Sequence, residues 1–183
     1  MLHTTSFFSD TVLNLASIGY DSNVFSKQLC MNHNFLVNRI ANSKITVVRT
    51  HGNQESIQTS HGDVDVALMS SLPTGTLSYS ELVIFGACET GKGGCYQTNL
   101  VNATYSAGAQ TVIGFEDSVW NTEVNDWCFA FFEEIANGET ISSACYAADL
   151  YIETYWYDPT TPEVEITTDS WYIAGNSNAI LSN

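Results

Sequence analysis

Basic residues are scarce in this chain of 183 residues, which holds five Lys and Arg against twenty Asp and Glu. The formal net charge is therefore -15 at pH 7. A general nucleic-acid-binding protein needs a basic surface, and anionic membrane surfaces attract basic proteins, so both partner classes are disfavoured. Proline is also scarce, with three residues, while 44% of the chain is hydrophobic. This composition is typical of a globular protein rather than a disordered one.

Long hydrophobic runs and paired cysteines are missing as well. No stretch reaches the ~18 consecutive apolar residues of a membrane span, and the N-terminus lacks the basic start and apolar run of a signal peptide. We expect a soluble protein, either cytoplasmic or secreted. The cysteines are odd in number and have no C-x-x-C spacing, so neither a disulfide framework nor a metal site is expected. Three of them are interpreted as buried small hydrophobic residues: Cys30, Cys128 and Cys145.

The length favours one domain over residues 1–183, and the pattern along the chain predicts an α/β fold. Apolar spacing and caps predict helices at residues 9–18, 33–41, 99–107, 123–136 and 142–155. Compact apolar segments predict strands at 45–48, 82–85, 111–115 and 171–175, with a short extended segment at 20–25. Strands that are apolar throughout and alternate with helices indicate a mostly parallel sheet with helices on both faces.

Two reactive residues follow predicted strands directly. His51 comes after the strand at 45–48, and Cys88 comes after the strand at 82–85. Sites in parallel sheets lie at the carboxyl ends of the strands, so neighbouring strands would bring both residues to one edge. A cysteine nucleophile needs a proton-exchanging partner, and histidine is the commonest one near neutral pH. The amides of Gly52 and Cys88 are candidate oxyanion-hole donors, and the expected reaction is acyl transfer through a thioester.

Two other residues compete for these roles. His61-Gly62 is a second His-Gly pair, but it lies in polar sequence with no strand before it. Cys95 follows Gly93-Gly94 in a loop and likewise lacks a preceding strand. We therefore rank His51 and Cys88 ahead of both.

The segments around these residues resemble a known peptidase family. Ile45-Thr-Val-Val-Arg-Thr-His51-Gly52 and Leu82-Val-Ile-Phe-Gly-Ala-Cys88-Glu-Thr-Gly91 look like the His-Gly and Ala-Cys signatures of clan CD caspase-like cysteine peptidases. The Ala-Cys-Glu-Thr-Gly string resembles CHAT domains, residues 106–114 resemble the region after the cysteine in CHAT domains and separases, and residues 172–181 resemble the last strand of gingipain-like members.

The resemblance implies a caspase-haemoglobinase fold, a three-layer α/β/α sandwich, and cysteine endopeptidase activity with Cys88 and His51 as the catalytic dyad. It implies no cofactor and a peptide or protein substrate, with specificity set by the residue before the scissile bond. Residues 19–24 look like the family's second strand, so the first strand would fall before Met1, as in a trimmed domain or a fragment of a longer chain.

The expected substrate-binding residues are acidic. Separase-like members read a basic residue with an Asp shortly after the strand that ends here at Phe115. The simplest alignment places Ser118 at that position, and Glu116 and Asp117 are adjacent to it. Glu89, beside Cys88, is a further candidate for the pocket wall. A buried carboxylate favours a cationic side chain over a neutral one, so cleavage after Arg or Lys is one expectation. The alternative is that these acids only contribute to the surface charge.

Two alternatives to an active endopeptidase remain. The first is an inactive caspase-like domain that keeps the fold for interaction or regulation. A weaker hypothesis is a calcium-dependent assembly that uses the acidic residues near the C-terminus: Asp158, Glu163, Glu165 and Asp169. Natural substrate, autoprocessing and oligomeric state do not follow from these patterns.

Overall fold

The computed structural model describes residues 15–20, 32–156 and 168–182. These residues divide between two compact units. The sheet unit comprises Ser26–Asn121 and Ser170–Asn176, and the helical unit comprises Met1–Phe25, Thr122–Asp169 and Ser177–Asn183. Whether the chain is one domain, as its length predicts, stays a prediction.

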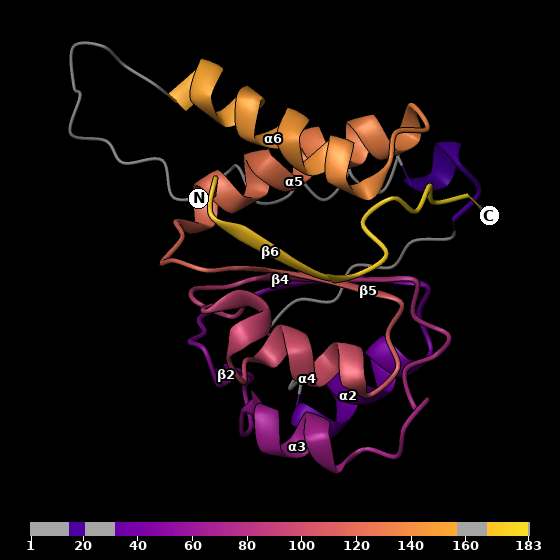
Figure 1. Cartoon of the computed structure of the whole chain (residues 1–183), viewed down its shortest axis with the longest axis vertical. Coiled ribbons are helices and arrows are strands. Elements are labelled where there is room, and N and C mark those ends of the chain that lie inside the picture. The colour runs from indigo at the N-terminus through magenta and orange to yellow at the C-terminus, as the bar shows by residue number, and fades with distance from the viewer. Residues whose placement is uncertain (1–14, 21–31, 157–167, 183) are drawn as a thin grey trace. The chain divides into compact units, whose positions relative to one another are not determined.

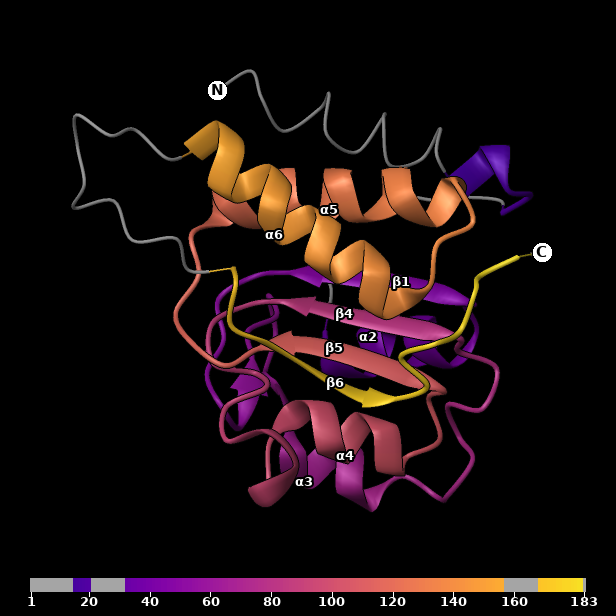
Figure 2. The same cartoon turned by 45° about the horizontal axis from the view of Figure 1, so that its top comes forward.

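The sheet unit, seen from its edge in Figure 1, is built on four strands in the order β1-β4-β5-β6 (Figure 2). Strand β1 pairs with β4 in parallel, β4 pairs with β5 in parallel, and β6 pairs with β5 in the antiparallel sense. The sheet is therefore mostly parallel, as predicted. The strand bounds are β1 (Ile45–Arg49), β4 (Leu82–Gly86), β5 (Thr111–Phe115) and β6 (Trp171–Gly175).

The burial of each strand accounts for its residue pattern. Every residue of β4 and β5 is buried, which explains why both strands read as continuous apolar runs rather than as alternating ones. The edge strands β1 and β6 are mostly half-buried. The predicted strand segments match the observed strands to within one residue at each end.

Three helices of the sheet unit lie on one face of the sheet (Figure 2). An Asx residue caps each of them by accepting a hydrogen bond from a backbone N–H of the first turn: Asn32 caps α2 (His33–Ala41), Asp65 caps α3 (Val66–Ser71) and Asn99 caps α4 (Leu100–Ser106). Helices α2 and α4 confirm the expected segments, and Asn99 is the cap rather than the first helical residue.

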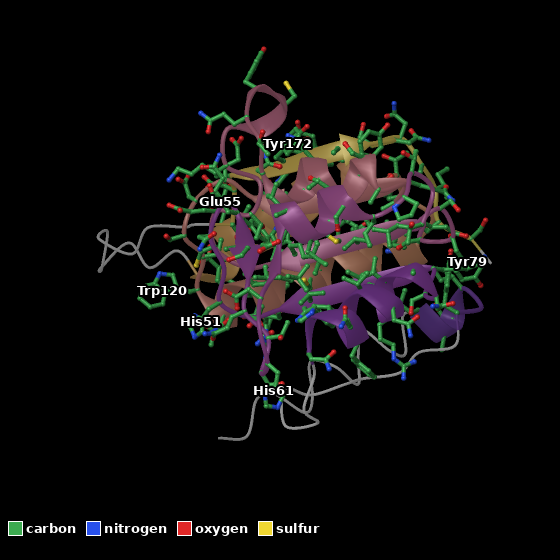
Figure 3. All side chains as sticks on the ribbon, turned by 90° about the horizontal axis from the view of Figure 1, so that it is seen from below. His51, Glu55, His61, Tyr79, Trp120 and Tyr172 are labelled. Carbon is green, nitrogen blue, oxygen red and sulfur yellow. The ribbon has the colours of Figure 1, made fainter. Side chains whose placement is uncertain are left out.

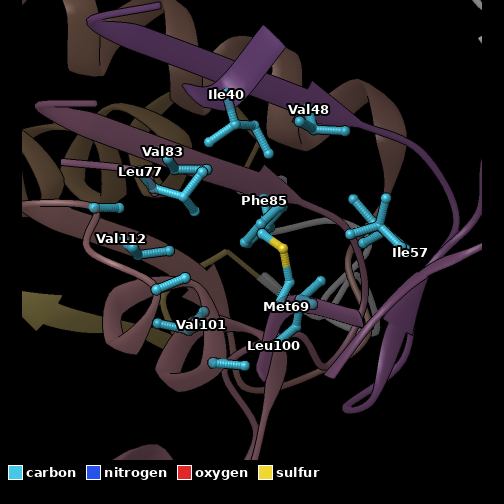
Figure 4. Packing of buried hydrophobic residues seen from close by; sticks show 14 of the residues in the cluster. Ile40, Val48, Ile57, Met69, Leu77, Val83, Phe85, Leu100, Val101 and Val112 are labelled. Atoms are coloured by element: carbon cyan, nitrogen blue, oxygen red, sulfur yellow. The ribbon is translucent and has the colours of Figure 1, made fainter. Parts of the chain in front are cut away.

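A hydrophobic core joins these helices to the sheet (Figure 4). Met69 of α3, Leu100 of α4 and Phe85 of β4 are each fully buried at its centre. Val83, Val112 and Ile40 are also fully buried and belong to the same cluster. Burying each of these side chains stabilises the fold by about 1.5–3 kcal/mol, so the cluster fixes the sheet beneath the loops that follow its strands.

The helical unit contains α5 (Asn121–Ala136) and α6 (Ile141–Trp156). The indole N–H of Trp127 donates a 2.8 Å hydrogen bond to Asp149, which ties α5 to α6. Trp127 also stacks on Phe131, with ring centroids 5.2 Å apart. The prediction of two amphipathic helices is confirmed, and α5 begins two residues earlier than expected.

The structure contains short elements that the sequence pattern does not reveal. Residues 53–65 read as a polar stretch, yet they hold the two-stranded pair β2 (Ser56–Ile57) and β3 (Val64–Asp65). Helix α3 and the 3₁₀ turn η2 (Gly94–Tyr96) are also missed. Each of these elements has at most six residues, too few to show a periodicity. The extended segment expected at 20–25 lies almost wholly outside the described residues.

The close approach of β6 to β5 generates a stability prediction. Gly175 has φ +108°, and a Cβ there would overlap the carbonyl oxygen of Gln110. Gly75 has a similar φ of +87°, but a Cβ there would meet nothing within 4 Å. We expect Gly75→Ala to cost about 1 kcal/mol through backbone strain alone. Gly175→Ala should cost about 3 kcal/mol or more, because strain and overlap add. Urea unfolding of both variants measures the difference, and equal losses would contradict the packing seen at Gly175.

Candidate active site

His51 and Cys88 follow two paired strands at matching positions. In the β1–β4 pair, Arg49 lies opposite Gly86 as the last residue pair. His51 and Cys88 each lie two residues beyond that pair. Because the strands are parallel, both residues leave the sheet at its carboxyl edge, as the sequence predicts.

Direct packing joins the two segments beyond the strands. A Cβ built on Gly52 would lie only 2.9 Å from the Cβ of Ala87, the residue before Cys88. It would also lie 3.1 Å from the backbone oxygen of Ser56 and 3.2 Å from the Ile57 side chain. Only glycine fits here without displacing its neighbours, so the backbone after His51 rests against the side chain of Ala87, the residue before Cys88.

A tight turn fixes the direction of the chain at His51. The Gln58 N–H donates to the His51 carbonyl at 2.8 Å, and the Asn53 N–H donates to the Ser56 carbonyl at 2.9 Å. The Asn53 side chain in turn accepts from the N–H groups of Glu55 and Ser56. These bonds close residues 51–58 into a hairpin with an exposed His51 side chain.

Cys88 is half-buried and touches the loop after β5. Its thiol donates to the Val119 carbonyl, with sulfur and oxygen 3.7 Å apart. The Glu89 N–H donates to the Asp117 carbonyl at 2.9 Å, and the Gly91 N–H donates to the Phe115 carbonyl at 2.9 Å. The segment after β4 is thus bonded to the segment after β5. Within the described part of the chain, the amides of Gly52 and Cys88 have no acceptor.

Trp120 is a site residue that the sequence reasoning misses. It directly follows Val119, whose carbonyl contacts the Cys88 thiol, and 68% of its side chain is exposed. Figure 3 shows Trp120 and His51 on the same side of the molecule, seen from below. A large aromatic residue exposed after a strand is the available signal, because such residues are normally buried.

Asn99 is a second residue that the sequence pattern misses, because the pattern places it only as the first residue of a helix. It is fully buried, and its side-chain amide donates to the carbonyls of Gly91, Lys92 and Gly94 at 2.9–3.3 Å. One side chain thereby holds the loop that follows the candidate nucleophile.

The three acidic candidates lie on these loops with different contacts. Glu89 forms an ion pair with Lys92, 2.8 Å between Nζ and Oε1. The carboxylate of Glu116 lies near Gly94, and its backbone N–H donates to the Ser170 carbonyl at 2.7 Å. Asp117 is exposed, and its carbonyl oxygen is the acceptor for Glu89. All three residues are therefore near the carboxyl edge, and a common pocket for them stays a prediction.

The competing residues have other neighbours. His61 forms a bridge with Asn32, and its carbonyl lies 3.4 Å from Nδ1 of His33, beside α2. Cys95 is exposed on η2, near Tyr172 of β6. Burial, with added effects of Cys95 and Glu116, raises the pKa of the Tyr172 hydroxyl, which donates to Asn102 at 2.9 Å.

Metal ligands do not gather in the part of the chain that the structure describes, where no group of three or more His, Cys, Asp and Glu side chains is placed to hold an ion. Three of the four acids in the calcium hypothesis lie outside the described residues, and Asp169 is exposed. Among the described helices, none combines the length and apolar character needed to cross a membrane.

Solved structures share this arrangement of strands and helices. The Arg-specific cysteine proteinase gingipain R (RgpB) matches with a TM-score of 0.68 and 14% identity, over 97% of this chain and 42% of that chain. The complex of the Porphyromonas gingivalis RgpB pro- and mature domains matches with a TM-score of 0.70 and 14% identity, over 96% of this chain and 43% of that one. The chain has a gingipain-like fold.

The remaining comparisons limit this finding to the fold. A structure described as a protease matches with a TM-score of 0.63 and 12% identity, over 78% of this chain and 36% of that chain. No protein-family model matches the sequence, and no curated protein matches it. The chain spans about two fifths of the length of the gingipain chains. The expected caspase-like α/β fold is confirmed, and at this identity the likeness concerns the fold alone.

The burial of the cysteines predicts their reactivity. Cys88 is half-buried and Cys95 exposed, whereas Cys128 and Cys145 are 1% and 0% exposed, as expected of small hydrophobic residues. Burial also raises the pKa of the Cys145 thiol well above its usual value, so little reactive thiolate forms.

We expect iodoacetamide to modify Cys88 and Cys95 in the native protein at least about 100-fold faster than Cys128 and Cys145, because the buried pair reacts only when the protein unfolds locally or globally. Peptide mapping by mass spectrometry distinguishes the sites, and urea-unfolded protein, which should react at all five cysteines, is the control. Cys30, the third cysteine interpreted as buried, lies outside the described residues. Equal rates in the native state would contradict this packing.

Proposed function

We propose that this chain is the catalytic part of a cysteine endopeptidase with Cys88 as nucleophile and His51 as general acid and base. The observation that carries the proposal is the matched position of the two residues, each two steps beyond the Arg49–Gly86 pair, with Gly52 packed on Ala87. A cysteine and a histidine at one sheet edge have the residue types that acyl transfer requires. The gingipain-like fold supports the same reaction class.

The proposed reaction has two halves. His51 takes the proton of the Cys88 thiol as the sulfur attacks the scissile carbonyl carbon, and the amides of Gly52 and Cys88, which have no acceptor in the described chain, bind the resulting oxyanion. His51 gives that proton to the leaving amine as the C–N bond breaks, which leaves a thioester on Cys88. His51 then takes a proton from water as the hydroxyl oxygen attacks the thioester carbon, and it returns this proton to the Cys88 sulfur as the C–S bond breaks, which releases the acid and restores the thiol.

The proposed substrate carries Arg or Lys before the scissile bond. Glu89, Glu116 and Asp117 all lie on the loops that follow β4 and β5, and the whole chain has a net charge of -15. The exposed face of Trp120 adds a surface on which a cationic side chain can stack. The description of RgpB as Arg-specific is consistent with this choice.

The dyad proposal is tested with four variants. Cys88→Ala should lower kcat for reporter peptides by about 10³-fold or more, because no other group supplies the nucleophile. His51→Ala should lower kcat by about 10²–10⁴-fold, the usual contribution of general acid–base catalysis. Cys95→Ala and His61→Ala are matched controls and should keep full activity. Unchanged turnover in Cys88→Ala would refute the proposal. A folded wild-type protein without activity on a broad peptide library would favour the inactive interaction domain.

The substrate proposal is tested by changing one charge. Asp117→Asn should lower kcat/KM for Arg and Lys reporters by about tenfold, because a charge-assisted hydrogen bond is lost, and should leave a neutral reporter unaffected. Asp63→Asn removes an exposed acid elsewhere on the same unit and should change neither. A parallel fall in activity for all reporters would assign Asp117 to the loop structure instead of to specificity.

A further inference from the structure

Lys92 occupies an unusual place in the charge pattern. It is the only Lys or Arg after Arg49, in a stretch that carries eighteen of the twenty Asp and Glu. That one cation lies four residues after Cys88, on the loop that Asn99 holds. If Lys92 only offset the negative charge of the surface in general, any exposed position would serve equally well.

The geometry fixes Lys92 beside two of the acidic candidates. Its ammonium lies 2.8 Å from the Glu89 carboxylate, its N–H donates to the Glu89 carbonyl at 3.0 Å, and its own carbonyl accepts from Asn99 at 3.2 Å. Glu89, and more weakly Asp117, raise the pKa of the Lys92 ammonium, which therefore stays charged at neutral pH. The backbone is thus held while the charged end remains 48% exposed.

Glu89 is itself held in an unfavourable backbone conformation. Its φ is +56°, and it is the only residue other than glycine with a positive φ among residues 15–20, 32–156 and 168–182. Strain of this kind is concentrated at functional sites, where the surrounding structure imposes it. Here the strained residue comes directly after the candidate nucleophile, and its carboxylate is paired with Lys92.

We propose that Lys92 is a built-in competitor of the substrate: it neutralises Glu89 and Asp117 in the free protein and is displaced by the basic side chain of a bound peptide. This inference rests on the proposed function and names Lys92 as a residue that sets specificity. Exposed ion pairs contribute little stability, so a substrate cation can replace Lys92 at low cost. Lys92 would then weaken binding of basic peptides and leave neutral peptides unaffected.

The first test compares two lysine variants. Lys92→Met should raise kcat/KM for Arg and Lys reporters roughly two- to fivefold, the range expected from removing one exposed ion pair, and leave a neutral reporter unchanged. Lys44→Met is the matched control, because Lys44 forms a comparable 3.0 Å pair with Glu81 at the start of β4. It changes the net charge equally and should alter neither activity. A fall for all reporters in Lys92→Met would make Lys92 a structural support of the loop and overturn the proposal.

The second test does not require peptidase activity. In a background with Cys30→Ser and Cys95→Ser, Cys88 is labelled with methanethiosulfonates that carry a trimethylammonium group or no charge, and the ratio of the two rates is measured. Lys92→Met should raise this ratio roughly two- to fivefold, and Lys44→Met should not. A raised ratio in a protein without peptidase activity would support the competition and refute the proposed function. An active peptidase with an unchanged ratio would refute the competition alone.

Discussion

The parallel pairing of β1 with β4 is the constraint on which the rest of the candidate site depends. Its register places Arg49 opposite Gly86 and so delivers the segments that carry His51 and Cys88 to one edge. A register shifted by one residue would invert the faces of β1 and expose Val48, one of the core residues of the sheet unit. The hydrophobic core therefore selects the same alignment that the proposed chemistry needs.

Beyond the strands, hydrogen bonds to the backbone replace sheet pairing. The loop after β4 is bonded to the loop after β5 through Glu89 and Gly91, and the side chain of Asn99 binds three of its carbonyl groups. Each such bond contributes about 1 kcal/mol on average, and a buried unpaired carbonyl costs more than that. The loop geometry is thus set by a few polar contacts.

The sequence alone predicts much of the scaffold and part of the site. The strands can be predicted because the residues of β4 and β5 are buried throughout, and His51 and Cys88 can be predicted as site residues because each follows a strand. The places of Trp120 and Asn99 cannot be predicted in this way, since they depend on how the loops after β4 and β5 meet in space. The ion pair of Lys92 with Glu89 is likewise hidden, because it requires the left-handed turn at Glu89. Local patterns reveal what a strand or helix buries, whereas contacts between loops depend on the register of the whole sheet.

The order of the strands has a consequence for synthesis of the protein. Strand β6 lies 55 residues after β5 in the chain, yet it pairs with β5 and its preceding residue Ser170 accepts a hydrogen bond from Glu116. The loop after β5 therefore lacks this anchor until the ribosome has made the residues of β6. Closing so long a loop carries an entropic cost that shorter connections avoid. A nascent chain would hold His51 and Cys88 before the loop after β5 could be anchored, which delays the assembly of the candidate site until β6 has emerged.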